Sequence, residues 1–168
     1  MCIRDSQLSV QKNDKFTTGI VYMPIALAYV VSFFKKKNID VEVRDLFGQN
    51  PTHSQIIDDK IILGDDIRTL KFTNLDKIKC FFVYANQVAN HNSIKKIVLH
   101  LKNNYKNIPV IILENSQAVT AYSLDVVKEK FFDFGSDYLV IGDLEYTSYE
   151  LFSNLNNLPW FVKNTKPV

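Results

Sequence analysis

The sequence predicts an α/β fold: a Rossmann-like, doubly wound and mainly parallel sheet of about five strands, with helices on both faces. Three short apolar runs, rich in β-branched and aromatic residues, support this prediction, and they span residues 79–85, 108–114 and 137–142. Each run is followed by polar residues and then by a helical segment. Nearly continuous apolar strands that alternate with helices indicate a parallel sheet that is buried on both faces.

The first half of the chain predicts a helix, an edge strand and a loop, in that order. Residues 24–37 begin with Pro24, which suits the first helical turn, and continue with good helix formers. Residues 38–45 alternate apolar with charged side chains, which indicates a strand near a sheet edge. Gly48, with an asparagine and a proline close behind it, then predicts a loop. Residues 52–78 fit a short helix, a short strand pair or both.

The corner after the third apolar run combines one glycine, two acids and a helix cap. Thr147 and Glu150 form a T-x-x-E pattern, which predicts a capping box with Thr147 as the N-cap residue. Gly142 allows a tight exit from the strand, and Asp143 and Glu145 lie near the positive end of the helix. Two interpretations stay open: a purely structural corner, or carboxylates that accept hydrogen bonds from a ligand. The predicted helices of the second half cover residues 92–105, about 122–133 and 148–155.

Length and composition indicate one globular domain in a reducing compartment. The 168 residues are 46% hydrophobic, which is enough for one buried core. The net charge of +2 comes from 20 basic and 18 acidic side chains, and residues 35–37 are the only run of three lysines, so nucleic acid is not an expected partner. Cys2 and Cys80 form neither a disulfide framework nor a metal-binding spacing. A cytoplasmic location is therefore expected.

One uncharged stretch has nearly the length of a membrane-spanning helix. Residues 16–34 carry no charge and precede the three lysines. Gly19 and two threonines at one end, and Pro24 within the stretch, divide it into a short segment and a helix of about ten apolar residues. We therefore expect a helix that is buried against the sheet, with lysines at its C-terminal end, and no membrane partner.

The motifs of several common functional sites are missing. The five glycines form neither G-x-G-x-x-G nor a Walker A loop. Asn86 and Asp143 stand where a phospho-receiver domain needs an aspartate and a lysine. His91 and His100 would lie on opposite faces of one helix, so they cannot share a metal ion there. No nucleophile elbow is present, and Cys80 is expected in the core.

A fold of this class predicts where a ligand binds. In an open parallel sheet, ligands bind at the carboxyl ends of the strands, where the strand order reverses. The loops expected at that edge are residues 84–92, 114–122 and 142–147, with residues 45–51 at the flank.

Two stretches, taken in order, resemble the cobalamin-binding domain that precedes the radical S-adenosylmethionine domain in a large enzyme family. Residues 23–47, MPIALAYVVSFFKKKNIDVEVRDLF, resemble its proline, Ala-Tyr segment, helix and aspartate-ending strand, at Pro24, Ala28, Tyr29 and Asp45. Residues 137–155, DYLVIGDLEYTSYELFSNL, resemble its strand that ends in G-E-G-E before a threonine and a helix, at Gly142, Glu145 and Thr147. The match spans about residues 19–157.

The resemblance implies a cobalamin-binding module that presents the cobalt face to a neighbouring active site. The candidate cofactor contacts are Tyr84, Ala85, Asn86, Glu114, Asn115, Ser116, Gln117, Gly142, Asp143 and Glu145. Many members carry Gly-Gly where this chain has Glu114 and Asn115, and those glycines leave room for the nucleotide tail of cobalamin. Two larger side chains are expected to crowd that slot. The sequence also lacks D-x-H-x-x-G, which excludes the histidine-ligated binding of the mutases.

The expected organisation is one domain with short extensions. Residues 1–6 resemble a non-native leader, residues 7–157 form the cobalamin-binding-like domain, and residues 158–168 begin a linker to a missing C-terminal domain. S-adenosylmethionine and the iron–sulfur cluster belong to that catalytic domain, since C-x-x-x-C-x-x-C is absent here. The chain alone is then not catalytic. Two alternatives stay open: a scaffold of the same fold that has lost cobalamin, and a stand-alone α/β enzyme for a small phosphorylated or nucleotide ligand.

Overall fold

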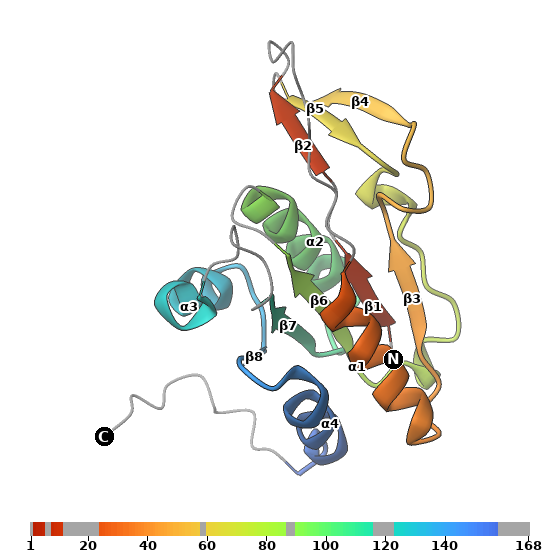
Figure 1. Cartoon of the computed structure of the whole chain (residues 1–168), viewed down its shortest axis with the longest axis vertical. Helices are drawn as coiled ribbons and strands as arrows, with labels where there is room; N and C mark the ends of the chain where they lie inside the picture. Colours follow the sequence, from red (N-terminus) through yellow and green to blue (C-terminus); the bar gives the residue numbers. More distant parts are fainter. Residues whose placement is uncertain are drawn as a thin grey trace.

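A computed structural model describes residues 2–5, 8–11, 24–57, 60–86, 90–115 and 123–157 (Figure 1). Its main sheet is parallel and has the strand order β3-β1-β6-β7-β8. The strands are β1 (Cys2–Asp5), β3 (Glu42–Asp45), β6 (Phe81–Ala85), β7 (Val110–Glu114) and β8 (Tyr138–Val140). The predicted α/β class is confirmed, and so is the edge position of the strand within residues 38–45.

A second, antiparallel sheet lies beyond the main one, at the top of Figure 1. Its order is β2-β5-β4, with the strands β2 (Leu8–Gln11), β4 (Ser54–Ile57) and β5 (Lys60–Leu63). Two short 3-10 helices follow, η1 (Ile67–Thr69) and η2 (Leu75–Lys77). Residues 52–78 therefore contain both a strand pair and short helices, the combination that the sequence left open.

The described residues form four α-helices: α1 (Ile25–Lys36), α2 (His91–Asn104), α3 (Leu124–Asp133) and α4 (Leu144–Asn154). The first three lie between strands of the main sheet in the chain, and α4 follows β8. The three helices predicted at residues 24–37, 92–105 and about 122–133 are confirmed in place and type, whereas the fourth, predicted at residues 148–155, begins earlier, at Leu144. Lys35 and Lys36 lie in the last turn of α1, where the helix dipole favours positive charge. None of the helices in the described ranges is long and apolar enough to cross a membrane. Residues 16–23 of the uncharged stretch lie outside these ranges.

Alternate side chains of β6 enter two separate core clusters, because successive residues of a strand point to opposite faces. Phe81, Val83 and Ala85 pack with residues of α2 and α3. Phe82 and Tyr84 pack with residues of α1 and α4. Each face of β6 is therefore covered by a pair of helices, which explains why every residue of this strand is apolar and buried.

The predicted capping box at Thr147 is wrong. Helix α4 begins at Leu144, and Asp143 is its N-cap residue, with a carboxylate oxygen that accepts a hydrogen bond from the Tyr146 amide at 3.0 Å. The amide of Thr147 already donates to the carbonyl of Asp143 at 3.2 Å, so Thr147 lies inside the first turn. The helix starts early because β8 ends at Val140 and Gly142, at φ +85°, turns the chain at once.

The first residues of the chain take part in the main sheet. Cys2 pairs with Glu42 of β3 on one side and with Phe81 of β6 on the other. Backbone pairing does not depend on which side chains the strand carries. The interpretation of residues 1–6 as a non-native leader, and the domain limits drawn from it, therefore stay predictions.

Candidate functional site

The carboxyl ends of the parallel strands define the candidate site. From β1 the chain first adds β3 on one side, and then β6, β7 and β8 on the other. The strand order therefore reverses between β1 and β6, which is where open α/β sheets hold their ligands. Three groups of predicted contact residues lie at this edge, each at the exit of a strand, that is, at the carboxyl end of β6, β7 or β8.

At the exit of β6, two of the predicted contacts are part of the core. Tyr84 and Ala85 are only 2% and 3% exposed. Asn86, the next residue, lies at the edge and binds protein groups on two sides. Its side-chain oxygen accepts a hydrogen bond from Asn90 at 3.1 Å, and its backbone carbonyl accepts one from the Asn115 side chain at 2.6 Å. Asn86 thus links the exits of β6 and β7.

At the exit of β7, Glu114 is a buried acid whose side chain joins two other segments. The residue is 8% exposed. Its Oε1 accepts a hydrogen bond from the Leu124 amide at 2.9 Å, and its Oε2 accepts one from the Gly142 amide at 3.3 Å. A buried carboxylate needs such donors, because burial without hydrogen bonds is strongly unfavourable. Glu114 therefore connects β7 with the start of α3 and with the corner after β8.

At the exit of β8, Asp143 and Glu145 both accept hydrogen bonds from residues of α4. Asp143 caps α4, and Glu145 lies in its first turn, half-buried, where its backbone carbonyl accepts a hydrogen bond from the Ser148 hydroxyl at 3.3 Å. Gly142 is exposed, and a methyl group there would meet no other atom within 4 Å. The structural interpretation of this corner therefore accounts for Asp143, while Gly142 faces open space.

Four of the predicted residues thus lie together: hydrogen bonds join Asn86 with Asn115 and Glu114 with Gly142, and Glu114 and Asn115 are neighbours in the chain. Ser116 and Gln117 lie outside the described residues. Asn90, which is 1% exposed, joins this cluster although the sequence did not single it out. Its signal was an asparagine directly before helix α2, at the N-cap position.

The flank of the edge, after β3, is held by local hydrogen bonds. Asp45 ends β3, and its Oδ1 accepts from the amides of Phe47 at 3.0 Å and Gly48 at 2.8 Å. A side chain at Gly48 would collide with this carboxylate, which explains the glycine. The aspartate that the resemblance places at the strand end is therefore occupied in shaping the turn.

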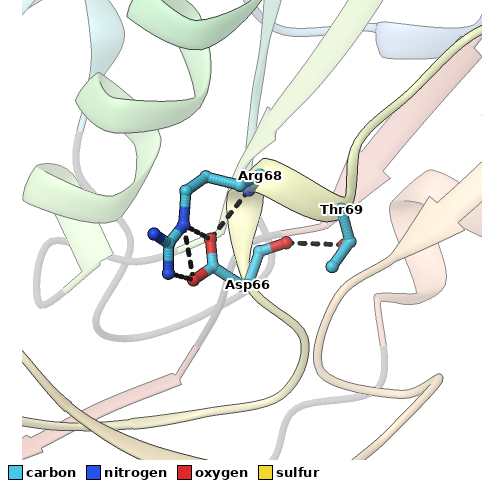
Figure 2. Close-up of polar contacts among 3 residues, drawn as sticks. All are labelled: Asp66, Arg68 and Thr69. Atoms are coloured by element: carbon cyan, nitrogen blue, oxygen red, sulfur yellow. Dashed lines mark hydrogen bonds and ion pairs between the residues drawn. The ribbon is translucent and has the colours of Figure 1, made fainter.

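A second acid on this flank is paired with an arginine, as Figure 2 shows. Asp66 caps η1 by accepting from the Arg68 amide at 2.8 Å, and both of its oxygens also accept from the Arg68 guanidinium. Thr69 donates its hydroxyl proton to the Asp66 carbonyl at 2.6 Å. The hydrogen bond from the Arg68 side chain holds the pKa of Asp66 below its usual value. This carboxylate is thus committed to local structure.

His91, at the start of α2, packs against Phe131 of α3 and against Phe134, the residue directly after that helix. Its ring centroid lies 5.3 Å from that of Phe131 and 5.2 Å from that of Phe134. Burial lowers the pKa of His91, and the positive charges of Lys130 and Lys95 lower it further. The folded protein therefore favours the neutral imidazole.

Stability is expected to fall as the pH drops below about 6.5, the ordinary pKa of histidine. Because the folded-state pKa of His91 lies below the unfolded-state value, the unfolded chain binds this proton more readily. The contribution of His91 to the free energy of unfolding is complete above the unfolded-state pKa and is lost as the pH falls through the folded-state pKa. Urea unfolding between about pH 5.5 and 7.5 should show a steeper loss in the wild type than in His91→Phe, which keeps a ring between the two phenylalanines. Parallel pH profiles would contradict this.

Cobalamin, the group that the resemblance implies, fits one part of this edge and not another. The corner at Gly142 offers room. The exit of β7 does not, because Glu114 and Asn115 are buried and hydrogen-bonded. A nucleotide tail across β7 would require both side chains to move. Within the described ranges, no group of histidine, cysteine or acidic residues is arranged to hold a metal ion.

Comparison of the chain with family models, curated proteins and solved structures gave no match. The roles of the site residues therefore rest on the geometry described above.

Proposed function

We propose that this chain is a Rossmann-like, doubly wound module that binds cobalamin at the carboxyl edge of its parallel sheet and does not itself catalyse a reaction. The reversal of strand order between β1 and β6 is the observation that supports a ligand site at this edge. The cluster of Asn86, Glu114, Asn115 and Gly142 lies on the same edge. The sequence resemblance supplies the identity of the ligand.

In this proposal the module presents cobalamin to a radical S-adenosylmethionine domain of the parent protein, in the cytoplasm. Bound cobalamin would supply cobalt for methyl transfer or a related radical step. The residues of this chain bind and orient the cofactor: Gly142 leaves space at the corner, and Asn86 lies beside the strand-order reversal. S-adenosylmethionine and the iron–sulfur cluster belong to the other domain, and neither nucleic acid nor membrane is a proposed partner.

A titration of the purified chain with hydroxocobalamin in dim light tests the proposal. The cobalamin spectrum and co-elution on a sizing column are the measurements. Retention of the pigment with the protein is the expected result. Elution of all cobalamin as free cofactor, from the wild type and from a variant with an open β7 exit, would overturn the proposal.

A second function is favoured by the hydrogen bonds of Glu114. If its carboxylate permanently replaces the ligand, the chain is a scaffold or docking domain of the same fold that has lost cobalamin. The contacts to Leu124 and Gly142 support this alternative, because they use both carboxylate oxygens within the protein. The titration distinguishes the two functions, because a cobalamin-binding module retains cobalamin as the wild type and a scaffold does not.

The double substitution Glu114→Gly with Asn115→Gly is expected to strengthen cobalamin binding. It removes the two buried side chains that occupy the exit of β7, and a ligand no longer has to break their hydrogen bonds. A gain of about tenfold in affinity corresponds to the cost of releasing one or two such bonds. Spectroscopic titration measures it. The matched control is Glu129→Gly with Asn103→Gly, which removes an exposed carboxylate and an exposed amide elsewhere. Equal affinities of the two double variants would contradict a crowded slot.

A further inference from the structure

The carboxylate of Glu114 joins two segments that are far apart in the chain. Leu124 lies 10 residues after Glu114 and opens α3, while Gly142 lies 28 residues after it and turns the chain between β8 and α4. Both amides donate to one buried side chain. Any movement of that side chain away from the edge therefore breaks both contacts.

The start of α3 has no cap from its own N-cap residue. Ser123 occupies that position, and its side chain makes no capping hydrogen bond. The first amides of a helix have no partner within the helix. Glu114 takes this role from the neighbouring strand, because its Oε1 accepts from Leu124, the first residue of α3. The first turn of α3 thus depends on the position of Glu114.

Helix α4 differs from α3 in this respect. Its N-cap residue, Asp143, accepts from the Tyr146 amide, so its first turn keeps a local cap without Glu114. The amide that Glu114 binds at this corner is that of Gly142, directly before the cap. Release of Glu114 should therefore loosen the corner at Gly142 and the start of α3, and leave the first turn of α4 intact.

We infer that Glu114 is a latch that closes the exit of β7, with the amides of Leu124 and Gly142 as its two contacts. In the closed state described here, the carboxylate fills the exit and holds α3 and the β8–α4 corner beside it. A ligand that lies across β7 must displace the carboxylate and so uncap α3. The inference rests on the proposed function only in naming this exit as part of the ligand crevice.

Amide hydrogen exchange, followed by NMR on the full chain without ligand, tests the latch. In Glu114→Ala the amides of Leu124 and Gly142 are expected to exchange together, about tenfold faster than in the wild type, because both lose the same acceptor. The amide of Tyr146 should keep its rate. Excess sodium formate should slow both exchanging amides again by returning a carboxylate, and an equal concentration of sodium chloride should not.

Asn115→Ala is the matched control. It removes the adjacent buried side chain and its bond to Asn86, and leaves both contacts of Glu114 in place. Unchanged exchange at Leu124 and Gly142 is expected in this variant. If Glu114→Ala does not fold, Glu114→Gln provides the test, since its side chain keeps one acceptor oxygen instead of two and one of the two amides should exchange faster.

A change at only one of the two amides in Glu114→Ala, or at neither, would overturn the latch, as would an unchanged pair in Glu114→Gln. The exchange measurement can disprove the latch without any cobalamin present. Failure of the proposed function is visible as free elution of cobalamin, whether or not the two amides respond together.

Discussion

Replacement of Phe34 by alanine is expected to lower the free energy of unfolding by about 3–5 kcal/mol, the usual loss for a large aromatic side chain in a core. Phe34 is fully buried in the cluster between the sheet and helices α1 and α4. Its ring makes edge contacts with Phe82 of β6 at 5.7 Å and with Phe152 of α4 at 5.5 Å between centroids. One side chain thus joins three elements, and its loss leaves a cavity among them.

Urea unfolding measures this loss, and an unchanged dependence on urea would show that the effect is on stability. Tyr29→Ala is the matched control, because Tyr29 is an aromatic residue of the same helix that is 58% exposed. The control should lose less than about 1 kcal/mol. Similar losses in the two variants would show that Phe34 is not the centre of this cluster.

Replacement of Gly64 by alanine is expected to cost about 4 kcal/mol or more, for two separate reasons. Its backbone has φ +97°, which is unfavourable for a residue with a side chain. A methyl group there would also press on the carbonyl oxygen of Leu46 and lie 2.8 Å from the Cα of Phe47. These are backbone atoms after β3, so they cannot move aside as a flexible side chain can.

Gly142→Ala separates the two contributions. Gly142 also has a positive φ, +85°, but an added methyl group meets no atom within 4 Å. This control should therefore lose only the conformational part, about 1–2 kcal/mol. Thermal or urea unfolding of both variants gives the difference between them. Equal losses would mean that the chain after β3 relaxes around the new methyl group.

The sequence was most informative where local pattern and tertiary position agree. Strands β6 and β7 are apolar at every position but the last residue of β7, because both of their faces are covered, and the sequence shows them as continuous apolar runs. Helix α2 alternates buried and exposed positions with helical period, which made its place and type predictable. These elements also position the candidate site.

The start of α4 was mispredicted because two residues compete for the same role. Asp143 and Thr147 are both good N-cap residues, and each precedes acidic side chains. The choice between them depends on where β8 ends, and this is set by its pairing with β7 up to Val140. A local pattern does not contain that information.

The pairing of β2 in the antiparallel sheet and the role of Glu114 could not be predicted, for a related reason. Strand β2 pairs with β5, about fifty residues later in the chain, and short strands carry little pattern of their own. The family resemblance singled out Glu114 as a departure from glycine, but the partners of its side chain are backbone amides, which every residue except proline has. A contact to a backbone amide places no requirement on the type of the partner residue, so the sequence does not reveal it.

The position of β1 between β3 and β6 has a consequence for the time course of folding. Cys2 pairs with Phe81, so β1 is made early but meets this neighbour only after β6 has been synthesised. At roughly 5–20 residues per second, a growing chain spends several seconds with one edge of β1 unpaired. Contacts between such distant segments also slow refolding of a complete chain. The sheet is thus completed late, when residues up to Val140 of β8 have left the ribosome.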